Sequence, residues 1–359
     1  MILSYEEMDR EEWGRLVKTS ATGTWFQTPE AYCFYESMPE FFRPFVVAVE
    51  RVNDLTNERT LRGVCVGYVT KEKNAIKQYF TRRAIIIGGP ALADDCSMDE
   101  AETLMKAVRK KLSFTPSLLH SFIHSPIYIE TRNFNDYSKW KEAFEKAGFE
   151  YQKHLNFHVD TSSVEIVEAN LGKSRKRDIR TTIREGVTIV ELNGGLINDD
   201  ATLNGEMIRL VHEYYEILSY LYKTKVKTPL FPESFFQTLA KHPDARFLLT
   251  ELNGKIIGGT VCVAQEGKCL YEWFACGEDG VYPHVFPSCY ATYSGIRYAA
   301  EHNMPRFDMM GAGKPDEAYG VRDFKAKFGG KEVEYGRFIC ITKPMLYKMG
   351  VLGVKLLKK

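Results

Sequence analysis

The sequence predicts an α+β protein made of two similar units. Residues 1–159 give strands and helices in the order that is typical of a mixed α+β domain. A hairpin, a third strand, a helix and a further strand over residues 246–310 repeat this theme, without a repeat at the level of single residues. The length of 359 residues suits two domains of ordinary size. We expect these domains at 1–160 and 161–342, followed by a final helix at 343–359.

The first unit opens with two helices that carry start signals. Asp9 can cap a helix whose first turn holds Glu11 and Glu12, where negative charge is favourable. Pro29 suits the first turn of a second helix over 29–38. The period of the apolar residues predicts the other elements of this unit: a hairpin of 44–51 and 61–70, a strand at 83–88, a helix at 97–113, a strand at 126–131, a helix at 136–147 and a strand at 149–159.

The second unit begins near Thr161, where Thr161, Ser162 or Ser163 can cap a helix that runs to Leu171. Asn253-Gly254 is the strongest short signal for a hairpin. The other expected elements are a helix at 174–186, a strand at 187–192, helices at 203–221 and 232–242, hairpin strands at 246–252 and 256–264, a strand at 268–276, a helix at 287–303 and a strand at 306–310.

The helix at 174–186 is strongly basic. Arg177, Arg180 and Arg184 are spaced i, i+3 and i+7, so they share one face. Three arginines on one face can hold a phosphate or a polyanion by charge-assisted hydrogen bonds. The alternative is a solvated helix whose arginines pair with Asp178 and Glu185.

The stretch 305–336 carries the main candidate site. A short apolar strand turns at Gly311 and Gly313, and a short basic helix with Lys325 follows before the break at Gly329-Gly330. Glycines allow close approach of the backbone to a ligand, and a lysine fixed beside such a turn offers a point charge to a phosphate or an oxyanion. The alternative is an ordinary loop with a solvated lysine, followed by a strand-like run at 332–341.

Composition excludes several other classes. The net charge of +1 gives no global attraction to nucleic acid or anionic membrane. The eight cysteines form no CxxC pair and no histidine stands at zinc-finger spacing, so we expect reduced thiols, no metal site and a cytoplasmic protein. The acidic start of the chain lacks the apolar run of a signal peptide, and no window suits a transmembrane helix. No serine stands in a GxSxG elbow.

The final helix is amphipathic and carries lysines toward its end. We expect it to dock on the first domain. The alternative is a peripheral contact with an anionic surface at the inner face of the membrane, which is weak for a short helix with few charges.

Several segments, taken in order, resemble the FemAB family, the non-ribosomal peptidyltransferases that build the cross-bridges of peptidoglycan. The similar segments are FQTPE at 26–30, IYIETRN at 127–133, WKEAFEKAGFEY at 140–151, SRKRDIRTTIREGVTIVE at 174–191, YEWFACGED at 271–279, FDMMGAG at 307–313 and FKAKFGG at 324–330. Acetyltransferase-like proteins with the same core resemble the basic helix about as well. The resemblance implies tandem GNAT-like domains, each a mixed sheet flanked by helices, with the active cleft in the second.

The resemblance also implies roles for particular residues. Phe324 and Lys325 match the family's FK pair, whose lysine holds the anionic substrate or stabilises the reacting centre. Arg177 and Arg180 match its basic helix near the substrate channel. Tyr271 and Trp273 match the aromatic strand that lines this channel.

Two carboxylates are candidates for the proton acceptor. Glu272 could act as general base for an attacking amine, and Asp308 is the second candidate, or else a cap at the end of its strand. By alternation, Glu272 faces away from Tyr271 and Trp273, so only one of these two sets can line a given cavity.

The expected reaction is transfer of an acyl or aminoacyl group to a small-molecule or lipid-linked amine, such as a cell-wall precursor. No bound cofactor is expected, and the donor is either aminoacyl-tRNA or acyl-CoA. Residues 281–288 lack the small residues of the GNAT pyrophosphate loop, which weakens the case for CoA. The alternatives are a CoA-dependent N-acyltransferase and a non-catalytic module that binds RNA or another polyanion. No protein partner is expected.

Overall fold

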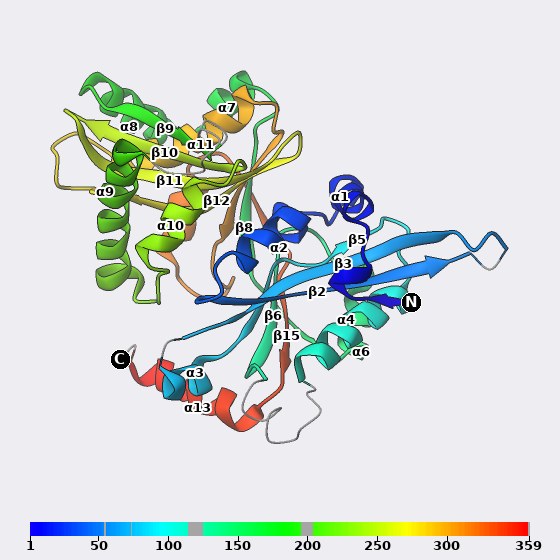
Figure 1. The fold of residues 1–359 in the computed structure, drawn as a ribbon. Coiled ribbons are helices and arrows are strands. Elements are labelled where there is room, and N and C mark those ends of the chain that lie inside the picture. Colours follow the sequence, from blue (N-terminus) through cyan, green and yellow to red (C-terminus); the bar gives the residue numbers. More distant parts are fainter. Residues whose placement is uncertain (54, 73, 114–124, 195–203, 358–359) are drawn as a thin grey trace. The chain divides into compact units, whose positions relative to one another are not determined.

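A computed structural model describes residues 1–53, 55–72, 74–113, 125–194 and 204–357. The chain forms two compact units (Figure 1). Unit 1 comprises Met1–His154 and Glu334–Lys359, and unit 2 comprises Leu155–Val333. This division differs from the expected boundaries at 160/161 and 342/343, because the chain returns to unit 1 before its final helix.

Unit 1 is a mixed sheet covered by helices. Its strand order is β1-β2-β3-β4-β6-β15-β7, and β5 pairs with β3. The strands are β1 (Ile2–Leu3), β2 (Phe42–Val52), β3 (Arg59–Thr70), β4 (Ala84–Gly88), β5 (Ala91–Leu92), β6 (Tyr128–Asn133), β7 (Glu150–Gln152) and β15 (Arg337–Ile341). The helices are α1 (Arg10–Thr19), α2 (Pro29–Glu36), α3 (Ala75–Thr81), α4 (Met98–Ser113), α6 (Lys141–Lys146) and α13 (Pro344–Leu357).

The expected helix starts of unit 1 are confirmed. The Asp9 carboxylate accepts hydrogen bonds from the backbone N–H groups of Glu11 and Glu12 and so caps α1. Pro29 is the first residue of α2, as its fixed φ favours. The apolar faces of α4 and α6 pack against the sheet to form the core of the unit. The short helix α3 was not predicted from the sequence.

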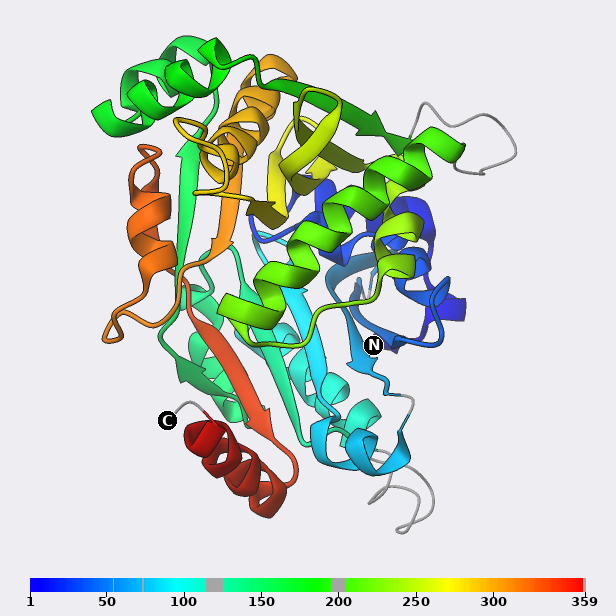
Figure 2. The same ribbon diagram turned by 90° about the vertical axis from the view of Figure 1, so that its left-hand side faces the viewer.

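Unit 2 is a second sheet, with strand order β14-β8-β13-β12-β11-β10-β9 (Figure 2). Its strands are β8 (Leu155–Asp160), β9 (Thr188–Asn193), β10 (Ala245–Leu252), β11 (Lys255–Gln265), β12 (Cys269–Gly277), β13 (Arg306–Gly311) and β14 (Lys331–Glu334). Its helices are α7 (Val164–Asn170), α8 (Lys173–Arg184), α9 (Gly205–Leu221), a π-helical turn at Tyr222–Val226, α10 (Glu233–Ala240), α11 (Pro287–Glu301) and α12 (Gly320–Ala326).

Helices cover both faces of this sheet. Residues of α11 form one apolar core with the strands, and α9 and α10 pack on the sheet through Tyr214, Phe235 and Phe236. Ser163 is the residue that caps α7. The Asn253-Gly254 hairpin is confirmed, since both residues have the positive φ that a tight hairpin turn requires. The α+β class is therefore confirmed.

Two expected strands are wrong. The run at 149–159 was expected to be one strand, but it divides between β7 in the first sheet and β8 in the second. The run at 332–341 was expected to be continuous, but the structure divides it between β14 in the second sheet and β15 in the first. Gly336 separates the two strands with a positive φ of 64°, and its N–H donates to the carbonyl of His154. Strand β15 then pairs with β6 and β7.

Among the described residues, no helix has both the length and the apolar character needed to cross a membrane.

Candidate active site

The candidate site lies where β12 and β13 diverge in unit 2. These two parallel strands are paired at Leu270–Phe307 and Tyr271–Asp308. Both strands are irregular close to this point. In β12 the register with β11 shifts next to Glu272, and in β13 the register with β8 shifts after Asp308. Such bulges re-aim side chains and are frequent beside active sites.

Lys325 closes the bulge of β13. Its buried ammonium donates hydrogen bonds to the carbonyl oxygens of Met309 and Gly311, the latter at 2.9 Å. Met310, between these two residues, has a positive φ of 57°, which is uncommon for a residue other than glycine. Burial lowers the pKa of Lys325, while the negative charges of Glu272 and Asp308 act in the opposite direction.

Glu272 is buried on the α11 side of the sheet. Its Oε1 accepts hydrogen bonds from the hydroxyls of Thr292 at 2.8 Å and Thr260 at 3.3 Å. Burial raises the pKa of Glu272, and the charge of Lys325 opposes this rise. Since burial dominates for both groups, Glu272 and Lys325 are both shifted toward their neutral forms.

Asp308 is fully buried on β13. Its Oδ1 accepts a hydrogen bond of 2.7 Å from the backbone N–H of Met310, so the carboxylate also supports the bulge. Its Oδ2 lies 3.1 Å from Nε2 of His158, which is its cross-strand neighbour on β8. The two expected alternatives, a second candidate for the proton acceptor and a cap at the end of its strand, are thus both compatible with this geometry.

Charge interactions link the three residues that were expected to be catalytic. Lys325, Glu272 and Asp308 interact electrostatically, although they come from three different elements. Buried ionisable groups with shifted pKa values, such as Lys325 and Glu272, are frequent at sites of proton transfer.

The aromatic candidates lie on the face of the sheet opposite to the Glu272 carboxylate, and Tyr271 is paired with Asp308 between β12 and β13. The ring of Trp273 packs edge-on against Phe235 of α10, with 5.5 Å between centroids, whereas Glu272 bonds to Thr292 of α11. The Tyr271 hydroxyl donates to the side chain of Gln265 at 3.2 Å, and the tyrosine is fully buried. The structure thus places Tyr271 and Trp273 away from the Glu272 carboxylate, as alternation indicated.

Phe324 joins α12 to α8. The guanidinium of Arg175 stacks over the rings of Phe324 and Phe328, at 4.4 and 4.9 Å from their centroids. Arg175 is itself buried and lies 3.6 Å from the carboxylate of Asp178. Phe324 therefore helps to fix the helix that carries Lys325.

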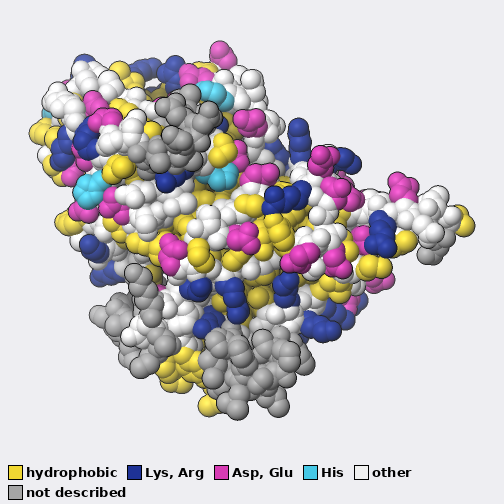
Figure 3. Space-filling view, viewed as in Figure 1, with side chains coloured by type: hydrophobic (Ala, Val, Ile, Leu, Met, Phe, Trp, Pro, Cys, Tyr) yellow, Lys and Arg dark blue, Asp and Glu magenta, His cyan; other side chains and the backbone are white. Residues whose placement is uncertain are grey.

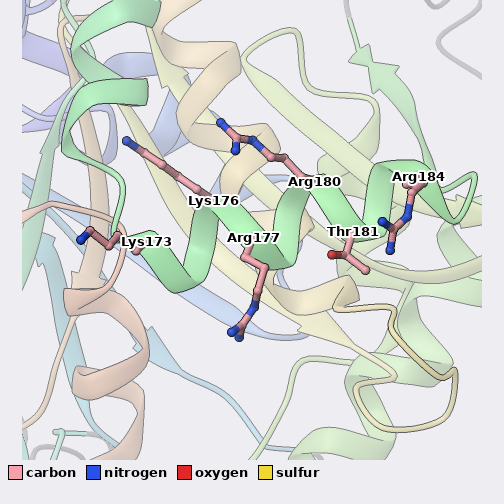
Figure 4. Close-up of a pocket in the computed structure, with 6 residues that line it drawn as sticks. All are labelled: Lys173, Lys176, Arg177, Arg180, Thr181 and Arg184. Atoms are coloured by element: carbon pink, nitrogen blue, oxygen red, sulfur yellow. The ribbon is translucent and has the colours of Figure 1, made fainter.

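The basic helix α8 presents an exposed cationic face. A cavity of about 460 Å³ lies along it (Figure 4). Arg177 contacts Asp178 at 3.1 Å and Arg184 lies 3.9 Å from Glu185, so two of the three expected arginines do make the ion pairs of the alternative interpretation. Both side chains remain largely exposed, as does Arg180. The residues that line the cavity are Lys173, Lys176, Arg177, Arg180, Thr181 and Arg184.

Sequence reasoning missed the partners of the buried charges. Thr260, Thr292 and His158 contact the candidate carboxylates, but each lies far from them in the chain. In the sequence, these partners could be recognised only as polar residues within apolar runs. Such residues are common, so this signal is weak.

A family model matches the part of the chain that contains the three charged candidates. The model of the FemAB family matches residues 250–354, which contain Glu272, Asp308 and Lys325. A search of curated protein sequences found no match.

Several solved structures share the fold over nearly the whole chain. The crystal structure of FemX aligns with a TM-score of 0.67 and 12% identity, covering 97% of this chain and 99% of FemX. The C-terminal domain of a putative lysylphosphatidylglycerol synthetase from Agrobacterium fabrum aligns with a TM-score of 0.57 and 11% identity, covering 97% of this chain and 95% of that one.

A tandem GNAT protein from the clavulanic acid biosynthesis pathway aligns with a TM-score of 0.55 and 9% identity, covering 95% of this chain and 98% of that one. Because these sequence identities are low, the alignments establish a shared fold and nothing further. The protein has a tandem GNAT-like fold, and its resemblance to the FemAB family is confirmed over residues 250–354.

Proposed function

We propose that the protein is a transferase that moves an aminoacyl group from a charged tRNA to an amine. The observation that carries this proposal is the buried Lys325 beside Glu272 and Asp308, within the segment that matches the FemAB family. The fold shared with FemX and with a putative lysylphosphatidylglycerol synthetase supports the same reaction class.

Lys325 is suited to stabilise the oxyanion. An ammonium has three N–H donors, and in this structure two of them serve the carbonyls of Met309 and Gly311. These two bonds fix the direction of the third N–H, to which a substrate oxygen can bind. A donor that is held in place before reaction stabilises developing charge without reorganisation.

Glu272 is suited to accept the proton. The amine nitrogen attacks the ester carbonyl, the C–N bond forms, and the C–O bond to the ribose of the tRNA breaks. The proton that leaves the amine passes through the Glu272 carboxylate to the departing ribose oxygen. The raised pKa of Glu272 favours this transfer, because a base with a pKa nearer neutrality takes up a proton more readily. Asp308 would hold the lysine and the bulge in position.

The exposed face of α8 is suited to a phosphate-bearing substrate. Its lysines and arginines could bind the diphosphate of a peptidoglycan precursor, which would make this precursor, free or lipid-linked, the amine acceptor. A cytoplasmic site of action is part of the proposal, because charged tRNA is found there.

Acyl-CoA is a less suitable donor. GNAT enzymes hold the CoA pyrophosphate with backbone N–H groups at the start of the helix that corresponds to α11. Here the N–H of Ser288, in the first turn of α11, donates to the carboxylate of Asp279 at 3.2 Å. A pyrophosphate at this position would meet a negative charge.

The test is a transfer assay with charged tRNA and a UDP-linked muropeptide. We expect Lys325→Ala to lower kcat by roughly a hundredfold or more, as is typical when one donor to an oxyanion is lost. Lys325→Gln keeps hydrogen-bond donors for the bulge and should be equally slow, because it lacks the charge. The matched control is Lys327→Ala, which removes an exposed lysine two residues away and should leave turnover within about twofold.

Thermal unfolding of each variant would confirm that it is folded. Unchanged turnover by folded Lys325→Ala would contradict the assignment. Transfer from acetyl-CoA in place of charged tRNA would favour a GNAT-type acyltransferase. Tight RNA binding without any turnover would favour a non-catalytic module.

A further inference from the structure

The second surface of interest is in unit 1, where α3 and α13 lie in contact. The ammonium of Lys343, just before α13, lies over the ring of Tyr79 of α3 at 5.2 Å from its centroid. On its inner side α13 is held by Tyr347, whose ring packs edge-on against Tyr128 of β6 with 5.5 Å between centroids. The helix therefore lies along the surface of the unit.

The outer side of this helix pair is unusually apolar for an exposed surface. Met345 and Met349 are spaced i, i+4 on α13 and are 81% and 58% exposed. Phe80, at the end of α3, is 50% exposed. Figure 3 shows apolar side chains gathered at the end of unit 1 where Figure 1 places these helices. Large flexible side chains that are exposed together mark an interaction surface.

Cations lie on or next to the two helices in the chain, and Lys343 contacts Tyr79 of α3. Burial lowers the pKa of Arg82, and the nearby positive charge of Arg43 lowers it further. Burial lowers the pKa of Lys343 in the same way, with a smaller contribution from Arg82. Arg43, Arg82 and Lys343 are thus close enough to repel one another, and Lys348 adds an exposed charge beside Met349. Positive charge on and beside these helices favours an anionic partner.

We propose that α3 and α13 form a docking face for the surface of an anionic phospholipid bilayer. The face combines cations for lipid phosphates with methionine and phenylalanine side chains that can enter the interface between headgroups and acyl chains. An RNA backbone would satisfy the cations but would offer no partner to the exposed methionines. The proposal concerns unit 1 alone and does not depend on the proposed transfer reaction.

The experiment is flotation of the full chain with lipid vesicles. We expect binding to vesicles of phosphatidylcholine mixed with phosphatidylglycerol, and weak binding to phosphatidylcholine alone. Binding should weaken as salt is added, because screening reduces the attraction between the cations and the lipid phosphates.

Two sets of variants separate the apolar from the charged contribution. Met345→Gln with Met349→Gln removes the apolar contacts and keeps helix propensity and charge, and we expect the partition coefficient to fall roughly tenfold. Leu55→Gln is its control, since Leu55 is 95% exposed in the β2–β3 turn of the same unit. Arg82→Gln with Lys343→Gln should reduce binding to the anionic vesicles roughly fivefold for each charge. Lys106→Gln with Lys146→Gln, which removes two exposed lysines of the same unit, is the control for net charge.

Absence of binding to anionic vesicles by the wild type would overturn the proposal. Equal losses in the face variants and their controls would overturn it as well. Binding of RNA through the same cations, without binding of vesicles, would assign this surface to a polyanion instead.

Discussion

Lys325 supports the backbone of its own site. The bonds to Met309 and Gly311 stabilise a bulge that contains Met310 with a positive φ. Substitution of the lysine therefore removes a charge and also leaves two carbonyls without their donor, which costs about 1–3 kcal/mol for each buried group. Activity and stability have to be measured together for any variant at this position.

Glu272 gives a prediction about pH and stability at the same scale. Its pKa in the folded protein is raised above the ordinary value of 4.5 by burial. The folded state therefore binds this proton more tightly than the unfolded state. The resulting stabilisation is fully present below 4.5 and is lost as the pH rises through the raised pKa, by about 1.4 kcal/mol for each unit of the rise.

We expect the free energy of unfolding of the wild type, relative to Glu272→Gln, to fall as the pH increases above 4.5. Urea unfolding of both proteins over a pH series measures this difference. Lys325 is present in both proteins, but its pKa also depends on the charge of Glu272, so the difference reports on the titration of the pair. Glu145→Gln, an exposed substitution on α6, is the control and should show no such trend. A difference that grows with pH would mean that Glu272 is stabilised as a carboxylate.

The sequence indicated the charged residues of the site but not their partners. Lys325, Glu272 and Asp308 stand in recognisable segments, and the fold brings them together. The hydroxyls of Thr260 and Thr292 reach Glu272 from β11 and α11. Local sequence carries no information about such contacts, because they depend on how the strands and helices pack. The catalytic roles themselves remain predictions.

At the scale of elements, local signals succeeded where one segment determines its own shape. The Asn253-Gly254 turn and the cap at Asp9 are examples, since each depends on bonds or φ values within a few residues. The runs at 149–159 and 332–341 failed, because alternation indicates a strand without indicating which sheet it joins. The bulge after Asp308 was also missed, since a bulge depends on the register with the neighbouring strand.

The turn after α12 gives the prediction at this scale. Gly329 has a positive φ of 78°, and a Cβ at this position would clash with the backbone oxygen of Asn170. We expect Gly329→Ala to lower the free energy of unfolding by about 1–3 kcal/mol or more, because strain and a backbone clash act together. Chemical denaturation at constant pH measures the loss.

Gly320→Ala is the matched control at the start of the same helix. A Cβ at Gly320 meets no atom within 4 Å, and its φ is not positive. Alanine should therefore be neutral or stabilise the helix slightly. Equal effects of the two substitutions would contradict the role assigned to the Gly329 turn.

At the scale of the whole molecule, charge is organised locally. The net charge is only +1, so long-range attraction cannot account for binding of a polyanion. The cationic face of α8 in unit 2 and the cations beside α3 and α13 in unit 1 are separate features with different surroundings. The first is lined by lysines, arginines and a threonine, whereas the second adjoins exposed methionine and phenylalanine side chains. This contrast is the reason for assigning a phosphate-bearing substrate to one and a lipid surface to the other.

Salt dependence tests the assignment of the α8 face. Each lysine or arginine that contacts a phosphate of RNA contributes about one unit to the slope of log affinity against log salt concentration. Arg180 is the best probe, because Arg177 and Arg184 also contact Asp178 and Glu185. Because the α8 face is assigned to the diphosphate of the acceptor, we expect Arg180→Gln to weaken binding of a UDP-linked muropeptide, and to lower the slope for charged tRNA by about 1 only if the RNA also lies on this face.

Arg209→Gln is the control, since it removes an exposed arginine of α9 that pairs with Glu206 at 2.6 Å. It changes the net charge by the same amount and should leave the slope unchanged. A slope that is equally reduced by both variants would mean that net charge governs the interaction. A slope that neither variant reduces would place the RNA elsewhere and leave the α8 face to the diphosphate of the acceptor, whose binding to Arg180→Gln can then be measured in the same salt series.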